Sequence, residues 1–130
     1  MVTLKFVFVF LLIISIGCNS DKKEDVVKET SYFYTHALWK VKPGHEKEFI
    51  EAWMELSDLF SNLPNPPIRG TLIQSTTDST LFYSFGPWTS LEDITAMRND
   101  QPSHEGIKKI MSLCTEATPA TYRVIKHIQL

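Results

Sequence analysis

The sequence lacks the features that would mark several classes of protein. It has only 2 cysteines, and its 4 histidines show no His-x₃-His or similar spacing, so no metal site is predicted. Its 13 basic residues do not exceed its 15 acidic ones. This argues against nucleic-acid binding, which depends on clustered Lys and Arg. There is no glycine-rich phosphate loop and no Rossmann fingerprint, so we predict no bound cofactor.

Long hydrophobic runs are also missing. The longest covers 11 residues, 6–16, whereas a membrane-spanning helix needs roughly 20. A run of this length after Lys5 is typical of a signal peptide. The Gly17-Cys18 pair that follows resembles a bacterial lipoprotein signal, in which the cysteine receives the lipid; the position three residues before it, usually Leu, is Ser15. A plain secretory signal and a short uncleaved anchor are the alternatives.

The lipoprotein resemblance implies a division of the chain. Residues 1–17 would be the signal peptide, and residues 18–31 the lipidated Cys18 with a polar, flexible tether. Residues 32–130 would form one folded domain, since this length fits a single core. We therefore expect the protein in the bacterial cell envelope, anchored to a membrane through lipid. With Cys18 acylated, Cys114 has no disulfide partner.

Hydrophobic periodicity beyond residue 31 predicts the order strand, helix, strand, strand, helix, strand. The predicted strands are 32–41, 70–76, 80–88 and 118–130, and the predicted helices are 45–63 and the paired segments 90–97 and 104–117, which Pro102 separates. This order predicts the α+β, ferredoxin-like βαββαβ fold, a four-stranded antiparallel sheet with its helices on one face.

Local signals support these elements. The first helix carries apolar residues at spacings of 3 and 4, namely Phe49, Trp53, Leu56, Phe60 and Leu63. Asp78-Ser79 marks the hairpin between the second and third strands. Thr89 with Glu92, or Ser90 with Asp93, offers a capping box for the second helix. We predict that Ser103 caps the last helical segment and that Cys114 lies on its buried side as an inert core residue.

The first and third strands are apolar on both faces. In the first strand one face carries Ala37 and Trp39, while the other carries His36 and Leu38. In the last strand we expect Tyr122, Val124, Lys126 and Ile128 to share one face, with His127 toward the same end of the sheet as His36. The helices can cover only one face of the sheet, and a second face exposed to solvent would carry polar residues. A second copy of the same sheet is the simplest cover, so we predict a homodimer that closes a barrel.

Three stretches carry a family resemblance. Residues 42–53, KPGHEKEFIEAW, 69–75, RGTLIQS, and 82–94, FYSFGPWTSLEDI, resemble the antibiotic biosynthesis monooxygenase (ABM) family, whose members share a dimeric α/β barrel. The resemblance covers roughly residues 32–128. It implies either oxidation of polyketide or quinol substrates by O₂ without a cofactor, or cleavage of bound haem.

The haem-degrading branch uses an Asn, a Trp and a His. Alignment on Gly44 and Trp88 places those roles on Ala37, Met97 and Ile107. None of these side chains ligates iron as imidazole does. Haem degradation is therefore disfavoured, unless a shifted register lets a histidine serve.

The candidate site has a pocket and a base. An apolar pocket would be formed by Ala37, Trp39, Trp53, Trp88 and Met97. The candidate catalytic residues are His36 and His104, because histidine is the commonest general base. Each has a structural alternative, since His36 can be an interface residue and His104 a solvated residue of a helix's first turn. Arg98 and Arg123 could attract an anionic or phenolic substrate.

Two functional hypotheses follow. In the first, the protein is a membrane-tethered, cofactor-independent monooxygenase acting on a small reduced aromatic or quinol-like molecule. In the second, it is a lipoprotein that binds a small apolar or aromatic ligand, or is purely structural, on the same scaffold. The second stays open because no pair of titratable residues has the spacing of a recognisable catalytic constellation.

Overall fold

The structure is a computed structural model, and it describes residues 32–130. The predicted signal peptide, the lipidated Cys18 and the tether lie outside the described residues. Among the residues that are described, no helix is both long and apolar enough to cross a membrane.

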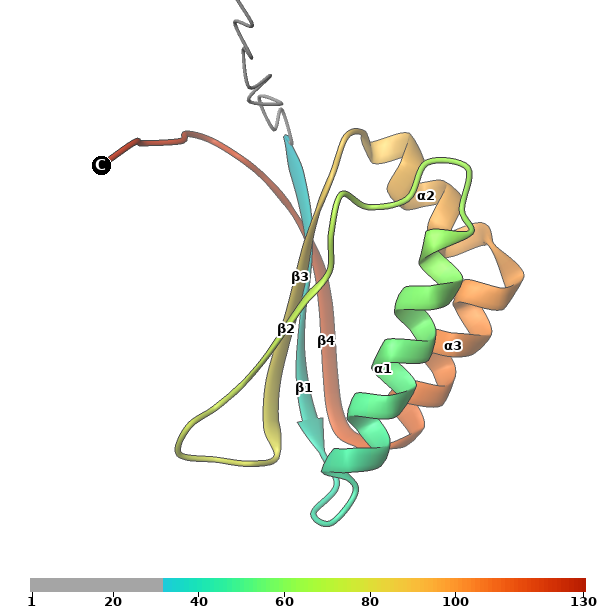
Figure 1. Cartoon of the computed structure of the whole chain (residues 1–130), viewed down its shortest axis with the longest axis vertical. Coiled ribbons are helices and arrows are strands. Elements are labelled where there is room, and N and C mark those ends of the chain that lie inside the picture. Colours follow the sequence, from blue (N-terminus) through green and yellow to red (C-terminus); the bar gives the residue numbers. More distant parts are fainter. Residues whose placement is uncertain (1–31) are drawn as a thin grey trace, which may run out of the picture.

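Seven elements follow one another along the described chain (Figure 1). They are β1 (Phe33–Val41), α1 (Glu46–Ser61), β2 (Thr71–Gln74), β3 (Leu81–Trp88), α2 (Leu91–Asn99), α3 (Gln101–Ser112) and β4 (Cys114–Arg123). Figure 1 shows the three helices on one side of the sheet. The predicted ferredoxin-like α+β fold is confirmed, with its second helix divided in two.

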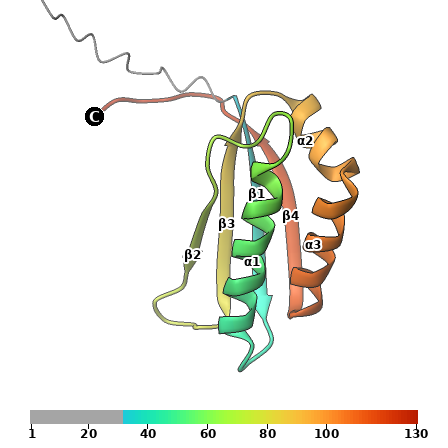
Figure 2. The same ribbon diagram turned by 45° about the vertical axis from the view of Figure 1, so that its right-hand side comes forward.

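The sheet has the strand order β2-β3-β1-β4, and all neighbouring strands are antiparallel. Figure 2 shows β2 at one edge and α1 crossing in front of the strands. The predicted hairpin is present, since β2 and β3 pair antiparallel. In its turn the Asp78 carboxylate accepts from the amide and the hydroxyl of Thr80 at 3.0 and 2.6 Å.

The main core lies between the sheet and helices α1 and α3. Alternate residues of β1, Ala37, Trp39 and Val41, are buried on this side. Phe49 and Ile110, from the two helices, are fully buried against them. This alternation follows from the two-residue period of a strand, which directs every second side chain to the same face.

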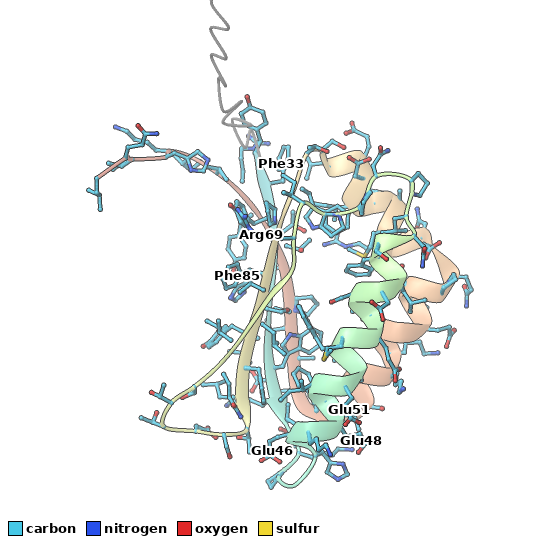
Figure 3. All side chains as sticks on the ribbon, viewed as in Figure 1. Phe33, Glu46, Glu48, Glu51, Arg69 and Phe85 are labelled. Atoms are coloured by element: carbon cyan, nitrogen blue, oxygen red, sulfur yellow. The ribbon has the colours of Figure 1, made fainter. Side chains whose placement is uncertain are left out.

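The helix starts carry the signals that helices require. Ser90 caps α2, accepting the backbone N–H of Asp93 at 3.1 Å, as one of the two predicted capping boxes requires. Glu46 and Glu48 lie in the first turn of α1, where a negative charge stabilises the helix dipole. Figure 3 shows both side chains at that end of the helix.

The predicted cap of the last helix is wrong by three residues. Asp100, not Ser103, is the N-cap of α3, and its carboxylate accepts both the amide and the hydroxyl of Ser103. Pro102 lies in the first turn of α3, where its missing N–H costs nothing. The break that Pro102 predicts is therefore real, but the proline begins the new helix.

The predicted bounds of the last strand were wrong. Helix α3 ends at Ser112, and β4 occupies Cys114–Arg123 instead of 118–130. Arg123 lies opposite Phe33, the first residue of β1. The amide of Val124 still donates to the carbonyl of Tyr32 at 2.8 Å, but residues 125–130 have no described strand to pair with. A strand without a partner leaves its backbone groups unpaired, and the apolar alternation in this tail therefore does not form a strand.

The new bounds of β4 change the predicted positions of two residues, Cys114 and His127. Cys114 is the first residue of β4 and not a residue of the inner helical stripe, and it is half-buried. His127 lies beyond the sheet in the exposed tail, so the structure does not bring it beside His36. Figure 1 shows the tail leaving the sheet on the side away from the helices.

The other face of the sheet carries apolar and aromatic side chains without any covering element among residues 32–130. Ile73 of β2 is 48% exposed, Phe85 of β3 is 36% exposed and Tyr122 of β4 is 54% exposed. Figure 3 shows Phe85 projecting away from the helices. We call this surface, which also includes Tyr34, His36, Leu38 and Tyr83, the open face.

Candidate functional site

A cavity of about 620 Å³ lies between the sheet and the helices. Its size falls in the range of small-molecule sites. The five pocket residues predicted from the sequence, Ala37, Trp39, Trp53, Trp88 and Met97, all line it. Strands β1 and β3 supply its floor, and the three helices and the proline-rich loop between α1 and β2 supply its walls.

The walls of the cavity are apolar and aromatic. Trp53, Phe60 and Ile107 come from helices α1 and α3, while Trp88 ends β3 and packs edge-on against Phe60 with ring centroids 6.0 Å apart. Trp88 is 1% exposed, so it is part of the core as well as of the cavity wall. An apolar wall of this kind excludes water and suits an apolar or aromatic ligand.

The hydroxyl groups of Thr35 and Ser84 are polar groups on the cavity floor. The indole N–H of Trp88 donates to the Thr35 hydroxyl oxygen at 2.9 Å. The indole N–H of Trp39 donates to the Ser84 hydroxyl oxygen at the same distance, 2.9 Å. Both hydroxyl residues line the cavity. Sequence reasoning missed them, although Thr35 alternates with Ala37 and Trp39 and could have been found from that pattern.

The rim of the cavity is polar and partly basic. Arg98 of α2 lines the cavity and donates to the hydroxyl of Thr121 on β4 at 2.7 Å, which joins a helix to the sheet at this end. Arg69 also lines the cavity. An anionic or phenolic ligand would meet these guanidinium groups as it enters.

Gly86 fixes how closely the loop before β2 approaches β3. A Cβ atom at Gly86 would lie 2.6 Å from the backbone oxygen of Arg69. The neighbouring amide of Ile68 donates to the carbonyl of Pro87 at 3.0 Å. Only a residue without a side chain fits here, and the glycine thereby brings Arg69 to the cavity.

The two candidate bases are differently placed. His36 borders the cavity, yet its ring lies on the open face. There its centroid is 5.3 Å from that of Tyr83 and 5.7 Å from that of Tyr122. Its neighbour Ala37 is the one directed to the helix side. His36 therefore cannot reach a ligand held between the sheet and the helices in this chain.

His104 lines the cavity from the first turn of α3. It is exposed, and its backbone amide donates to the carbonyl of Asp100 at 2.9 Å. Of the two predicted bases, it is the one that lies on the helix side of the sheet. Its catalytic role stays a prediction.

The positions that correspond to the haem-degrading branch also border the cavity. Ala37, Met97 and Ile107 all line it, and each presents an alkyl or thioether group where that branch has Asn, Trp and His. Met97 is 5% exposed, on the inner face of α2. These side chains do not fit haem, because they provide no strong axial ligand.

The remaining titratable residues do not form a second site. Within residues 32–130, no three His, Cys, Asp or Glu side chains gather in a group that could hold a metal ion. Burial raises the pKa of the Cys114 thiol, although nearby Lys42 opposes the shift. A thiol with a raised pKa is a poor nucleophile at neutral pH.

The fold and the cavity together define a class: ferredoxin-like α+β proteins with a largely apolar cavity between sheet and helices. The family profile "Antibiotic biosynthesis monooxygenase" matches residues 32–109. The chain therefore belongs to the antibiotic biosynthesis monooxygenase family. Among curated protein sequences, none matches the chain.

Solved structures share the fold at low sequence identity. SnoaB from Streptomyces nogalater, a cofactor-independent oxygenase, is 13% identical with a TM-score of 0.68, covering 75% of this chain and 97% of its own. A conserved protein of unknown function from Bacteroides thetaiotaomicron is 18% identical with a TM-score of 0.64, covering 72% and 98%. A protein from Methanosarcina mazei is 14% identical with a TM-score of 0.65, covering 73% and 94%. At these identities the likeness concerns the fold.

Proposed function

We propose that the protein is a cofactor-independent monooxygenase acting on a small reduced aromatic or quinol-like molecule. The observation that carries this proposal is the aromatic cavity of about 620 Å³ in a member of this family. The cavity could surround an apolar ring on several sides, and it offers hydrogen-bonding groups on its floor and rim. Such a site binds a planar apolar molecule and orients it through a few polar atoms.

The reaction balances without any further reductant. The substrate loses a proton from a hydroxyl group or an activated carbon, and the anion gives one electron to O₂. The superoxide and the substrate radical combine to form a hydroperoxide at carbon, and its O–O bond then breaks. In total, a CH₂ group and O₂ give a carbonyl group and water, so that four electrons pass from carbon to oxygen.

His104 is the proposed base in this scheme. It lines the cavity on the helix side of the sheet, and histidine is the commonest general base. Arg98 lies on the same rim and would stabilise the anion formed.

Oxygen consumption tests the proposal directly. Purified protein is incubated with reduced aromatics such as anthrone or 1-naphthol, and O₂ uptake is followed with an electrode. His104→Gln should lower the rate at least about tenfold, since positioned bases contribute roughly 10²- to 10⁴-fold. His45→Gln is the matched control, because His45 is exposed and hydrogen-bonded to Glu48 at the start of α1. It is not among the residues that line the cavity. Uptake no faster than in buffer for every substrate would reject the enzyme.

A binding function is the alternative, and the position of His36 favours it. That residue lies on the open face, which leaves one exposed histidine at the cavity. Native mass spectrometry of protein isolated from membranes separates the two functions. A retained apolar ligand without turnover would identify a binding protein, and O₂-dependent conversion of that ligand would identify the enzyme.

The proposal includes a homodimer formed through the open face. Apolar side chains there, such as Phe85 and Ile73, are exposed in one chain, and contiguous apolar surface of this kind marks an interface. A second copy supplies an equally apolar sheet and closes the barrel. Analytical ultracentrifugation at micromolar concentration should give a dimer, and Phe85→Glu should give a monomer. A monomeric unmodified protein would reject this part.

Membrane anchoring through Cys18 is also proposed. It rests on the sequence resemblance to lipoprotein signals, and the proposed apolar substrate class is enriched in membranes. Metabolic labelling with palmitate should label the unmodified protein and not Cys18→Ser. If both proteins appear equally in the soluble fraction, the anchor is rejected while the cavity proposal stands.

A further inference from the structure

The cavity floor contains two tryptophan–hydroxyl pairs. One joins Trp88 to Thr35, and the other joins Trp39 to Ser84, each at 2.9 Å from indole nitrogen to hydroxyl oxygen. Trp88 and Trp39 are 1% and 5% exposed, so their N–H groups are shielded from water. A buried N–H needs an acceptor, and these hydroxyl oxygens provide it.

The direction of each hydrogen bond determines what the hydroxyl offers. An indole nitrogen is only a donor, so the hydroxyl oxygen is the acceptor in both pairs. Each hydroxyl then keeps its own proton, which has to be directed elsewhere. Within residues 32–130, neither Thr35 nor Ser84 donates its hydroxyl proton to a side-chain or backbone acceptor. Both protons are free for a ligand in the cavity.

The two hydroxyls lie on the same side of the sheet as the ligand. Ser84 is opposite Ala37 in the β1–β3 register, and Thr35 is two residues before Ala37 on β1. Opposite residues and residues two apart share a face, and Ala37 is buried on the helix side. The two proton donors therefore lie at diagonal positions of neighbouring strands on the cavity floor.

We propose that Thr35 and Ser84 bind the oxygen atom of the ligand as hydrogen-bond donors, and that Trp88 and Trp39 position them for this. The site thereby selects aromatic ligands with a carbonyl or phenolate oxygen over hydrocarbons of the same shape. This inference rests on the proposed use of the cavity and adds the polar group that the ligand carries. In the monooxygenase scheme the same donors would stabilise the substrate anion.

Equilibrium dialysis with two matched bicyclic compounds tests the inference. 1-Tetralone carries one carbonyl group, and tetralin is the hydrocarbon of nearly the same shape. The unmodified protein should bind tetralone more tightly. Removing the engaged hydroxyl by Thr35→Val or Ser84→Ala should weaken tetralone binding about three- to tenfold and change tetralin binding by less than about twofold, the expected effect of one hydrogen bond.

Conservative variants separate a hydrogen-bonding role from a structural one. Thr35→Ser and Ser84→Thr keep the hydroxyl and should keep the preference for tetralone. Thr115→Val is the control, because Thr115 is a β4 residue outside the cavity whose hydroxyl donates to the carbonyl of Lys40. If Thr35→Val does not fold because Trp88 loses its acceptor, Ser84→Ala and the double variant Thr35→Ser/Ser84→Ala carry the test.

The outcomes distinguish this inference from the proposed function. Equal affinity for both compounds in the unmodified protein, or equal losses for both in the variants, would overturn the donor role and leave the cavity standing. Binding of neither compound would count against the cavity as a ligand site and overturn both. A loss confined to tetralone, and restored by the hydroxyl-keeping variants, supports the inference.

Discussion

The space between sheet and helices is filled at one end and hollow at the other. At the end where α1 begins, Phe49 and Phe82 pack with ring centroids 4.8 Å apart, and both are at most 1% exposed. At the end where α1 finishes, Phe60 and Trp88 border a cavity of about 620 Å³. The same two layers thus form a packed core at one end and enclose a cavity at the other.

The connections explain the difference between the two ends. At the filled end, the short turn around Gly44, with φ of 86°, returns the chain directly into α1. At the hollow end, residues 62–70 contain three prolines, which prevent both a helix and a ladder there. Pro66 and Pro67 of this loop line the cavity, as do Met97 and His104 on either side of the break between α2 and α3. The cavity therefore lies where the connections, and not continuous elements, close the layers.

The largest expected effect comes from the same truncation at both ends of α1. Phe49→Ala should lower the free energy of unfolding by about 3–5 kcal/mol, because Phe49 is fully buried and leaves a void. Phe60→Ala should cost less than half as much, since Phe60 is half-buried and already faces a cavity. Urea denaturation measures both. Equal losses would contradict the contrast between a filled and a hollow end.

A pair of glycine substitutions compares a site at the cavity, Gly86, with a site between two packed helices, Gly106. Gly86→Ala should destabilise the protein by about 1–3 kcal/mol, because the new Cβ would meet the rigid carbonyl of Arg69 at 2.6 Å. Gly106→Ala, in α3, should be close to neutral. Its Cβ would meet the movable methyl groups of Leu56 and Leu59 at 2.9 and 3.0 Å, while alanine favours the helix. Thermal unfolding of both variants decides between backbone and side-chain crowding.

Cys114, at the filled end, should react slowly with iodoacetamide. Burial raises the pKa of its thiol, so little thiolate forms at neutral pH, and the rate should keep rising above the pH at which an exposed cysteine levels off. Peptide-resolved mass spectrometry after timed alkylation follows Cys114 alone. Unfolding in urea should abolish the difference, and a rate equal to that of a free thiol in the folded protein would refute it.

The smallest effect concerns the Asp78 hairpin, which lies outside both ends of the core. The hydroxyl and the amide of Thr80 donate to the carboxylate and hold its pKa below the ordinary value for aspartate. The carboxylate therefore stabilises the hairpin above the pKa of the unfolded chain, and this support is lost as the pH falls through the lower, folded pKa. An NMR titration of the Thr80 amide should show that midpoint, and Asp78→Asn should remove it. A midpoint at the ordinary value would contradict the bond.

The pocket was easier to predict than the base. Ala37, Trp39 and Trp53 could be assigned because strand and helix periodicity indicates which residues face the interior. The same periodicity assigned His36 to the opposite face of β1, and the structure shows its ring there. The hydroxyls of Thr35 and Ser84 escaped notice, because their importance comes from two indole donors 53 and 45 residues away in the chain.

The sequence by itself determined the order of the elements, the two-faced strands and the apolar stripe of α1, because those depend on local periodicity. It did not determine where β4 ends, since a strand ends where its partner strand ends. Nor did it determine the cap of α3, since both Asp100 and Ser103 have side chains that can cap a helix. Only the tertiary structure decided that the three helices and the sheet leave a cavity at one end, and that two tryptophans donate to the hydroxyls of Thr35 and Ser84 on its floor. Both depend on contacts between residues far apart in the chain, which no local pattern records.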